Sequence, residues 1–280
     1  MIRVRRMTAE DIPLGMRLKQ QAGWNQTEAD WRRFLDLEPE GCFVAEWNGV
    51  PAATTTTCTF GPVGWVAMVL VDADKRGRGL AKALLGHALE FLERRNVRNV
   101  RLDATALGRP LYERLGFTVE YELVRYDGTL PLVEASGPPE GNAESAESYD
   151  ELCRLDARVT GTDRSRLLLR LFEENPDGLR VVRDGSEVAG FLTARLGSRA
   201  VQVGPCVATA GAGPRLLRDA WRRFAGQRVY MDIPTANTAA TALAAAQGLT
   251  VQRPFLRMCR GPSVGERVDV FWASSGPEKG

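Results

Sequence analysis

The sequence predicts an α/β fold of the mixed α+β kind, in which helices cover a mixed sheet and the chain forms two similar halves. Strand-like segments alternate with amphipathic helical segments along the first 128 residues. A stretch without large apolar residues, 134–148, then interrupts the pattern. Beyond it a similar order of elements returns, and 280 residues suffice for two domains of ordinary size.

Each predicted element of the first half has a local signal. Thr27 caps a helix that carries Glu28 in its first turn. The dipeptide Asn48-Gly49 joins two strands as a hairpin turn does. Residues 64–71 are apolar on both faces, which is typical of a central strand. The predicted order is a strand at 2–6, helices at 11–21 and from 27, strands at 42–47, 52–60 and 64–71, a helix at 80–92, a strand at 97–104, a helix at 110–115 and a strand at 117–126.

The second half repeats the later part of this order. Its predicted elements are strands at 179–183, 187–196 and 201–207, a helix from 213, a strand at 228–233, a helix at 238–245 and a strand at 249–258. Aligning 98–117 with 227–250 places Asp103 beside Asp232, so an internal duplication is plausible.

We therefore predict a first domain over 1–128, a linker over 129–148, a second domain over 149–261 and a tail over 262–280. Apolar residues within the tail favour a strand, whereas its last residues, SSGPEKG, are expected to be loose.

Composition excludes several classes of protein. The net charge of +2 gives no general reason to expect nucleic acid or an acidic membrane as partner. Five cysteines at least 16 residues apart and a single histidine, His87, provide neither a metal site nor a disulfide framework. The first residues do not have the pattern of a secretory signal. We expect a cytoplasmic protein without metal, and a homodimer remains open.

The most informative segment joins a buried strand to a helix through a glycine-rich turn. Gly77 and Gly79 allow phosphate oxygens to approach the backbone, and the first N–H groups of the helix form an anion site. Arg76 and Arg78 add charged donors. A P-loop is disfavoured because Leu80 follows Gly79, and Lys82 breaks the dinucleotide-binding pattern. The alternative is a solvated basic turn that binds nothing.

These motifs resemble those of the GNAT superfamily of N-acetyltransferases over about residues 1–128. The family's cofactor motif, Arg/Gln-x-x-Gly-x-Gly/Ala, is matched by 76–81, and its later motif by Tyr112 before Gly116-Phe117. The resemblance implies the acyl-CoA N-acyltransferase fold in two tandem GNAT-like domains, with acetyl-CoA as co-substrate. The second domain resembles a degenerate copy, because 207–213 has no Arg or Gln ahead of its glycines. This departure weakens the case for a second acetyl-CoA site.

The resemblance also implies roles for individual residues. Acetyl-CoA is expected between the strands that end at Val71 and Ala104, and Tyr112 is expected to act as general acid on the leaving thiolate. A backbone N–H near Val69 is expected to bind the oxyanion. The implied cofactor contacts are Val69, Leu70, Val71, Arg76, Gly77, Arg78, Gly79, Leu80, Ala81, Lys82 and Tyr112. For Tyr112, the alternative is a core tyrosine.

The general base and the acceptor site are less defined. Asp72 and Asp103 are candidate bases, as is an acidic residue acting through water, although Asp103 fits a structural role equally well. Trp24, Asn25 and Phe60 are candidate substrate contacts, with a core position as the alternative for Trp24.

The predicted function is acetyl transfer from acetyl-CoA to a primary amine of a small molecule, by direct attack in a ternary complex. Two alternatives remain: an acyl-CoA-binding sensor or interaction protein without turnover, and a protein acetyltransferase. The latter would use the basic helix face of Arg215, Arg218 and Arg222 to recruit an acidic partner, although a solvated face is the commoner role of such residues.

Overall fold

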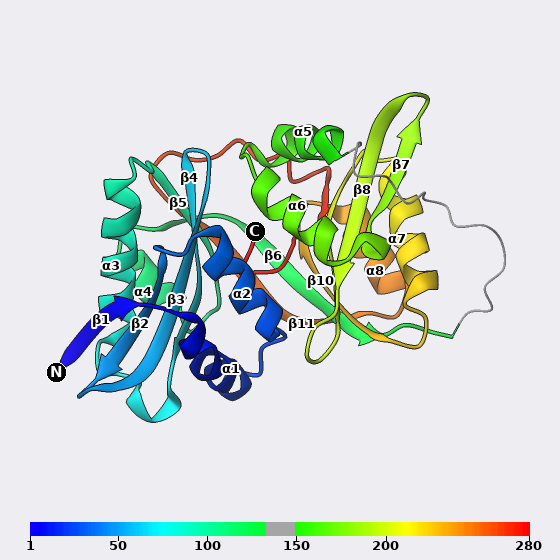
Figure 1. The fold of residues 1–280 in the computed structure, drawn as a ribbon. Helices are drawn as coiled ribbons and strands as arrows, with labels where there is room; N and C mark the ends of the chain where they lie inside the picture. The colour runs from blue at the N-terminus through cyan, green and yellow to red at the C-terminus, as the bar shows by residue number, and fades with distance from the viewer. Residues whose placement is uncertain (133–148) are drawn as a thin grey trace.

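The computed structural model describes residues 1–132 and 149–280 and shows one continuous sheet that runs through both halves (Figure 1). The predicted linker, 129–148, lies outside the described residues except for 129–132, where Thr129 still belongs to a strand and Leu130 is buried. The first half contains β1 (Ile2–Arg6), α1 (Ile12–Gln21), α2 (Glu28–Leu37), β2 (Cys42–Trp47), β3 (Val50–Phe60), β4 (Val63–Val71), α3 (Leu80–Arg94), β5 (Asn99–Ala104), α4 (Arg109–Arg114) and β6 (Thr118–Thr129).

The second half follows a similar order and ends in an additional short strand. It contains α5 (Tyr149–Thr160), α6 (Ser165–Glu174), β7 (Arg180–Asp184), β8 (Glu187–Arg195), β9 (Val201–Ala208), α7 (Ala212–Arg223), β10 (Arg228–Pro234), α8 (Thr238–Ala246), β11 (Thr250–Arg260) and β12 (Phe271–Ala273). No helix within the described ranges is both long and apolar enough to cross a membrane.

The two halves exchange their closing strands. The order across the sheet is β1-β2-β3-β4-β5-β11-β6-β10-β9-β8-β7, with β12 beside β9. Thus β11, from the second half, pairs with β5, whereas β6, from the first half, pairs with β10. These two exchanged strands also pair antiparallel with each other. Neither half completes its sheet with its own residues alone.

Helices cover both faces of the sheet in each half. In the first half, α3 packs on one face with Leu84 and Leu92, and α1 and α2 pack on the other with Leu18 and Trp31. In the second half, α7 and α8 share one core, and α5 and α6 share another. Leu167 of α6 extends into the core beneath α1 and α2, so the halves also meet through apolar contacts.

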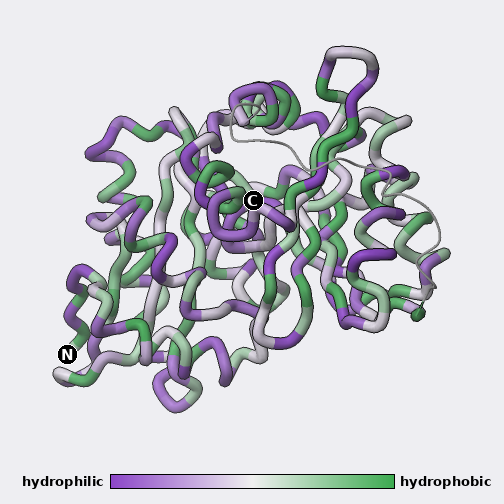
Figure 2. The backbone as a smooth tube through the Cα atoms, turned by 45° about the vertical axis from the view of Figure 1, so that its right-hand side comes forward, coloured by the Kyte–Doolittle hydropathy of each residue, from purple (hydrophilic) through white to green (hydrophobic). Residues whose placement is uncertain are grey.

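The end of the chain is buried, and the expectation of a loose terminus is wrong. Glu278 and Lys279 are 2% and 1% exposed. Figures 1 and 2 both place the C-terminal residues between the two halves, and Figure 2 shows that this segment is largely hydrophilic. Hydrophilic residues can lie there because their charges find partners on both halves, as described below. Composition alone does not show such partners.

Candidate active site

A gap between β4 and β5 forms the centre of the candidate site. The two strands pair in parallel only where Val63–Trp65 lies opposite Asn99–Arg101. Beyond Trp65, no strand of the described residues pairs with β4 on its β5 side. The peptide groups along this edge are therefore available to a ligand that runs parallel to a strand.

A bulge in β4 lies beside the start of this gap. Thr56 is opposite Ala67, whereas Thr54 is opposite Leu70, so that two residues of β4 face a single residue of β3. Met68, in the bulge, has a φ of +51°, which is uncommon for a residue with a side chain. A bulge re-aims backbone groups, and here it lies next to Val69, whose neighbourhood is predicted to bind the oxyanion. Nothing in the amino-acid sequence indicates that a methionine adopts this conformation.

The glycine-rich turn follows β4 directly. Gly77 and Gly79 have φ of +76° and +85°, and no atom lies within 4 Å of the position that a Cβ on Gly77 would take. Gly79 precedes α3, whose first N–H groups have no acceptor within the helix. The Arg76 side chain is exposed and donates from Nε to the Val71 carbonyl at 3.3 Å. This open, donor-rich turn fits a pyrophosphate.

The remaining residues of the predicted cofactor set have different exposures. Leu80 is buried and anchors α3 in the core, whereas Lys82 is exposed. The Arg78 guanidinium lies over the Trp47 ring, 5.2 Å from its centroid. Leu80 therefore has only its backbone to offer a ligand, and Arg78 and Lys82 offer charge.

Tyr112 lies in α4, within the core on the α3 side of the sheet. Its ring packs edge-on against Phe117 at 6.0 Å, and burial raises the pKa of its phenol to about 12. The phenol therefore keeps its proton at neutral pH, as a general acid must.

The two candidate bases have carboxylates that are already paired. A hydrogen bond from Arg17 lowers the pKa of Asp72, which also caps the turn by accepting from the Asp74 N–H. Asp103 accepts two bonds from Arg257 of β11, each 2.9 Å long, and its side chain is 2% exposed. Burial raises the pKa of Asp103, and the guanidinium opposes that effect.

Asp103 has a counterpart that supports a structural role. Asp232 of β10 accepts two bonds from Arg125 of β6, at 2.7 and 2.8 Å. Each pair therefore joins a central strand of one half to the strand contributed by the other half. We call these two pairs the strand clamps. Catalysis by Asp72 or Asp103 stays a prediction, and the clamp accounts for Asp103 without it.

The three candidate substrate contacts have different surroundings in the structure. The Asn25 amide donates to the Ala200 carbonyl and accepts from the N–H groups of Arg199 and Ala200, at 2.9–3.1 Å. Asn25 therefore joins the two halves. Contact between Asn25 and an acceptor stays a prediction, and the Asn25 amide would have to give up these hydrogen bonds to make it. Phe60 is buried and lines a narrow, partly open pocket with Trp65. Trp24 is half-buried at the edge of the α1 and α2 core.

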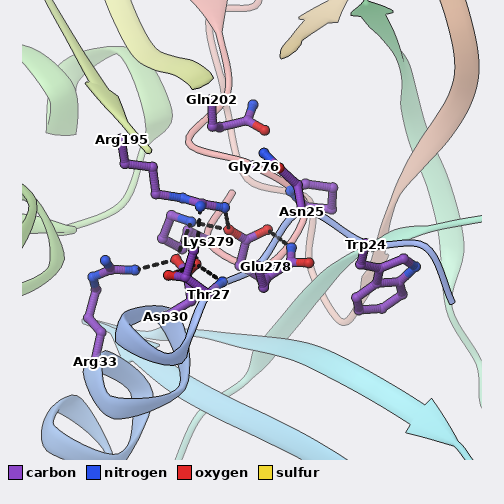
Figure 3. A network of polar contacts seen from close by, with 12 residues as sticks. Trp24, Asn25, Thr27, Asp30, Arg33, Arg195, Gln202, Gly276, Glu278 and Lys279 are labelled. Atoms are coloured by element: carbon purple, nitrogen blue, oxygen red, sulfur yellow. Dashed lines mark hydrogen bonds and ion pairs between the residues drawn. The ribbon is translucent and has the colours of Figure 1, made fainter. Parts of the chain in front are cut away.

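A cluster of buried charges holds the C-terminal residues in place close to Asn25. Figure 3 shows Asp30 and Arg33 of α2 together with Arg195 of β8 and with Glu278 and Lys279. Arg195 donates to Glu278 at 2.9 Å and lies 3.0 Å from Asp30, while Lys279 pairs with Glu278. We call these five residues the terminal charge cluster. Every charge in it has an opposite charge at contact distance, which is what allows the segment to be buried.

The terminal charge cluster is expected to make docking of the chain terminus sensitive to acid. Burial alone would raise the pKa of Glu278, but Lys279 and Arg195 outweigh it and lower this pKa to about 2. The Glu278 carboxylate therefore stabilises the folded chain fully above its unfolded pKa of about 4.5, and this stabilisation is lost as the pH falls towards 2. We expect the fluorescence of Trp65, which donates to the Pro277 carbonyl, to report this release.

The control is Glu278→Gln, which removes the titrating carboxyl and leaves Asp30 in place. Its unfolding free energy should depend less steeply on pH between 4.5 and 2 than that of the unaltered chain. Equal slopes would contradict the assignment.

Sequence reasoning missed three contributors to the site: the Met68 bulge, the Arg257 clamp and the buried terminus. Arg257 comes from β11, 154 residues away from Asp103 along the chain. The recurrence of Asp232 at the place of Asp103 was the one signal that pointed towards a duplicated structural role.

Comparisons with known proteins agree with this geometry. Residues 13–117 match the model of the acetyltransferase (GNAT) family, and residues 152–273 match that of an acetyltransferase (GNAT) domain. The chain is 25% identical over 183 residues to holothin acyltransferase of Pseudoalteromonas sp., covering 65% of this chain and 61% of that protein. The chain thus spans less than two thirds of the length of this curated relative.

Two solved structures match over all or nearly all of the chain. A proposed acetyltransferase from Pyrococcus horikoshii superimposes with a TM-score of 0.84 at 22% identity, covering 100% of this chain and 96% of that one. A tandem GNAT protein from the clavulanic acid biosynthesis pathway gives 0.63 at 16% identity, covering 94% and 100%. At these identities the likeness concerns the fold.

Proposed function

Since the chain belongs to the GNAT superfamily and carries two GNAT domains in tandem, we propose that it transfers the acetyl group of acetyl-CoA to a primary amine of a small molecule. The observation that carries this proposal is the unpaired edge of β4, which leads directly into the open turn at Gly77 and Gly79. An extended ligand with a pyrophosphate at one end fits this arrangement.

Residues of the first half would have different roles in acyl transfer. Acetyl-CoA, when bound, supplies an acetyl group on a thioester. The N–H groups at the start of α3, with Arg76 and Arg78, would hold its pyrophosphate. Backbone groups of Val69 and Val71 would align the pantetheine as an added strand does. A backbone N–H at the bulge would stabilise the oxyanion formed by direct attack of the amine.

Tyr112 would give its phenol proton to the sulfur as the C–S bond of the tetrahedral intermediate breaks. The proton that the amine loses on becoming an amide would pass to solvent, and the Tyr112 phenolate would regain a proton from solvent. Leu102 and Ala104 of β5 belong to the same core as Tyr112, on the α3 side. Because side chains alternate along a strand, Asp103 lies on the opposite face. The acid is thus on the face of α3, and the amine would approach from the face of α1 and α2.

A small acceptor is favoured because the second half covers that opposite face. Arg257 lies over the Trp65 ring, 4.8 Å from its centroid, and Glu266 pairs with both Arg101 and Arg257. The Pro277 carbonyl accepts from Trp65 at 3.3 Å. A face so covered leaves little room for a protein substrate.

The proposal is tested by release of free thiol from acetyl-CoA in the presence of amino acids, polyamines, aminoglycosides and peptides in turn. Amine-dependent release establishes a transferase and its acceptor class. Release with peptides alone would favour the protein acetyltransferase. Binding of acetyl-CoA without release for any amine would favour the sensor.

Tyr112→Phe is expected to lower kcat by about 100-fold, the usual contribution of a positioned general acid, while the Kd for acetyl-CoA changes by less than about twofold. The ring and its packing on Phe117 remain, so only the proton donor is lost. Rate and affinity are measured by thiol release and calorimetry. An unchanged kcat would assign Tyr112 to the core.

A further inference from the structure

The second half has its own pair of parallel strands that separate, β9 and β10. They pair in parallel at only two registers, Val201 and Gln202. In the first half, β4 and β5 likewise pair only at their beginnings. The difference is that β12 lies antiparallel along the remaining edge of β9, beside Cys206 and Val207. One gap is open along its β4 edge, and the other is occupied by the chain itself.

The hydrogen bonds place β12 at the position equivalent to the free edge of β4. The Asp72 N–H donates to Ala52 on β3, and the Thr209 N–H donates to Ala189 on β8. Because N–H groups alternate sides along a strand, the preceding residues direct theirs into the gap. In the first half that residue is Val71, which is predicted to bind pantetheine.

In the second half the residue is Ala208, and its N–H donates to the Val270 carbonyl at 3.1 Å. On the other side of the gap, the Ser274 N–H donates to the Asp232 carbonyl of β10 at 2.8 Å. Residues 270–274 thus bridge both strands, as a ligand bound between them would.

The start of α7 is also closed to a ligand. A Cβ on Gly213 would lie only 2.0 Å from the Trp272 ring, so the indole rests directly on the first turn of the helix. Its Nε1 donates to the Ala208 carbonyl at 3.0 Å. Only residues 209–211 join β9 to α7, whereas 72–79 join β4 to α3. The N–H groups of Ala212 and Gly213 already donate to the Thr209 carbonyl.

We infer that residues 270–274 are a permanent internal occupant of the second gap, so that each chain binds one acyl-CoA and binds it in the first half. The inference rests on the proposed function for the identity of the ligand. Displacing the occupant would expose Phe271 and Trp272, which are 0% and 1% exposed. Exposing two large aromatic side chains is unfavourable, so a ligand would have to compensate for it.

Hydrogen exchange on the full chain, resolved to single amides, tests the occupant without any ligand. The Ala208 amide should exchange about 100-fold more slowly than the Val71 amide, because only the former has a partner in its gap. Similar rates at the two amides would overturn the inference.

Native mass spectrometry with excess acetyl-CoA tests the stoichiometry. One bound equivalent is expected, together with slower exchange at Val71 and unchanged exchange at Ala208 and Phe271. Two bound equivalents, or faster exchange at Phe271 on addition of acetyl-CoA, would overturn the inference. No bound acetyl-CoA would instead contradict the proposed function, and the exchange rates without ligand would still decide whether the second gap is occupied.

Discussion

Arg125→Met is expected to lower the free energy of unfolding by about 3–5 kcal/mol, the usual cost of removing one partner of a buried ion pair. Arg125 and Asp232 are 2% and 1% exposed, and both oxygens of the carboxylate accept from the guanidinium. Tyr230 and Phe255 flank the same guanidinium, with ring centroids 4.9 and 5.2 Å away. In the variant the buried Asp232 side chain keeps a hydrogen bond from Gln202 but has lost both bonds from the guanidinium.

The matched control is Arg228→Met, on the strand that carries Asp232. Arg228 also forms a two-bond pair, with Asp127, but its side chain is 50% exposed. Its loss should cost less than about 1 kcal/mol, because exposed pairs gain little over solvation by water. Denaturant titration of both variants measures the difference. Similar losses would contradict the clamp, and Arg125→Met/Asp232→Leu should recover part of the stability by removing the unpaired charge.

The same argument applies to Arg257 and Asp103, and it separates structure from catalysis. If Asp103 serves only in its clamp, a substitution that weakens the clamp lowers stability and leaves the pH dependence of kcat unchanged. A general base would instead alter the pH profile. Because the exchanged strands are held at both sites, we expect the two halves to unfold together.

Arg76→Ala/Gly79→Asp is expected to weaken acetyl-CoA binding at least about 100-fold, which corresponds to about 2.7 kcal/mol. Arg76 is an exposed donor beside the turn, and its removal subtracts a charge-assisted bond to phosphate. Aspartate at Gly79 places a negative charge where the pyrophosphate would bind and introduces a side chain at a φ of +85°. Calorimetry measures the affinity, and thiol release should be abolished in parallel.

The second half supplies a matched control for this variant. Gly211 precedes α7 as Gly79 precedes α3, and no atom lies within 4 Å of the position of an added Cβ. Its φ of −79° suits any residue, so Gly211→Asp should fold normally. Its affinity for acetyl-CoA should match that of the unaltered chain. A large loss in this variant would place the phosphate site in the second half.

The amino-acid sequence by itself determined the fold class and the order of elements, because these depend on local signals. The pattern of Leu84 and Leu92 defines the buried face of α3, and Asn48-Gly49 defines the hairpin between β2 and β3. The signal at Gly77 and Gly79 is similarly local, because glycine adopts a positive φ without contacts from residues elsewhere in the chain.

Tertiary structure alone decided the features that join distant residues. The strand exchange pairs β5 with β11 and β6 with β10. The sequence of a strand does not specify which other strand it will pair with. Asp103 therefore looked equally suited to catalysis and to structure until Arg257 was placed beside it. The sequence of the terminus is polar, and for that reason it is expected to be loose. Glu278 and Lys279 can be buried only because Arg195 and Asp30, which belong to different halves, lie beside them in the folded chain. Local preference fixes an element, but the partner of a buried charge is fixed only by the fold that brings it there.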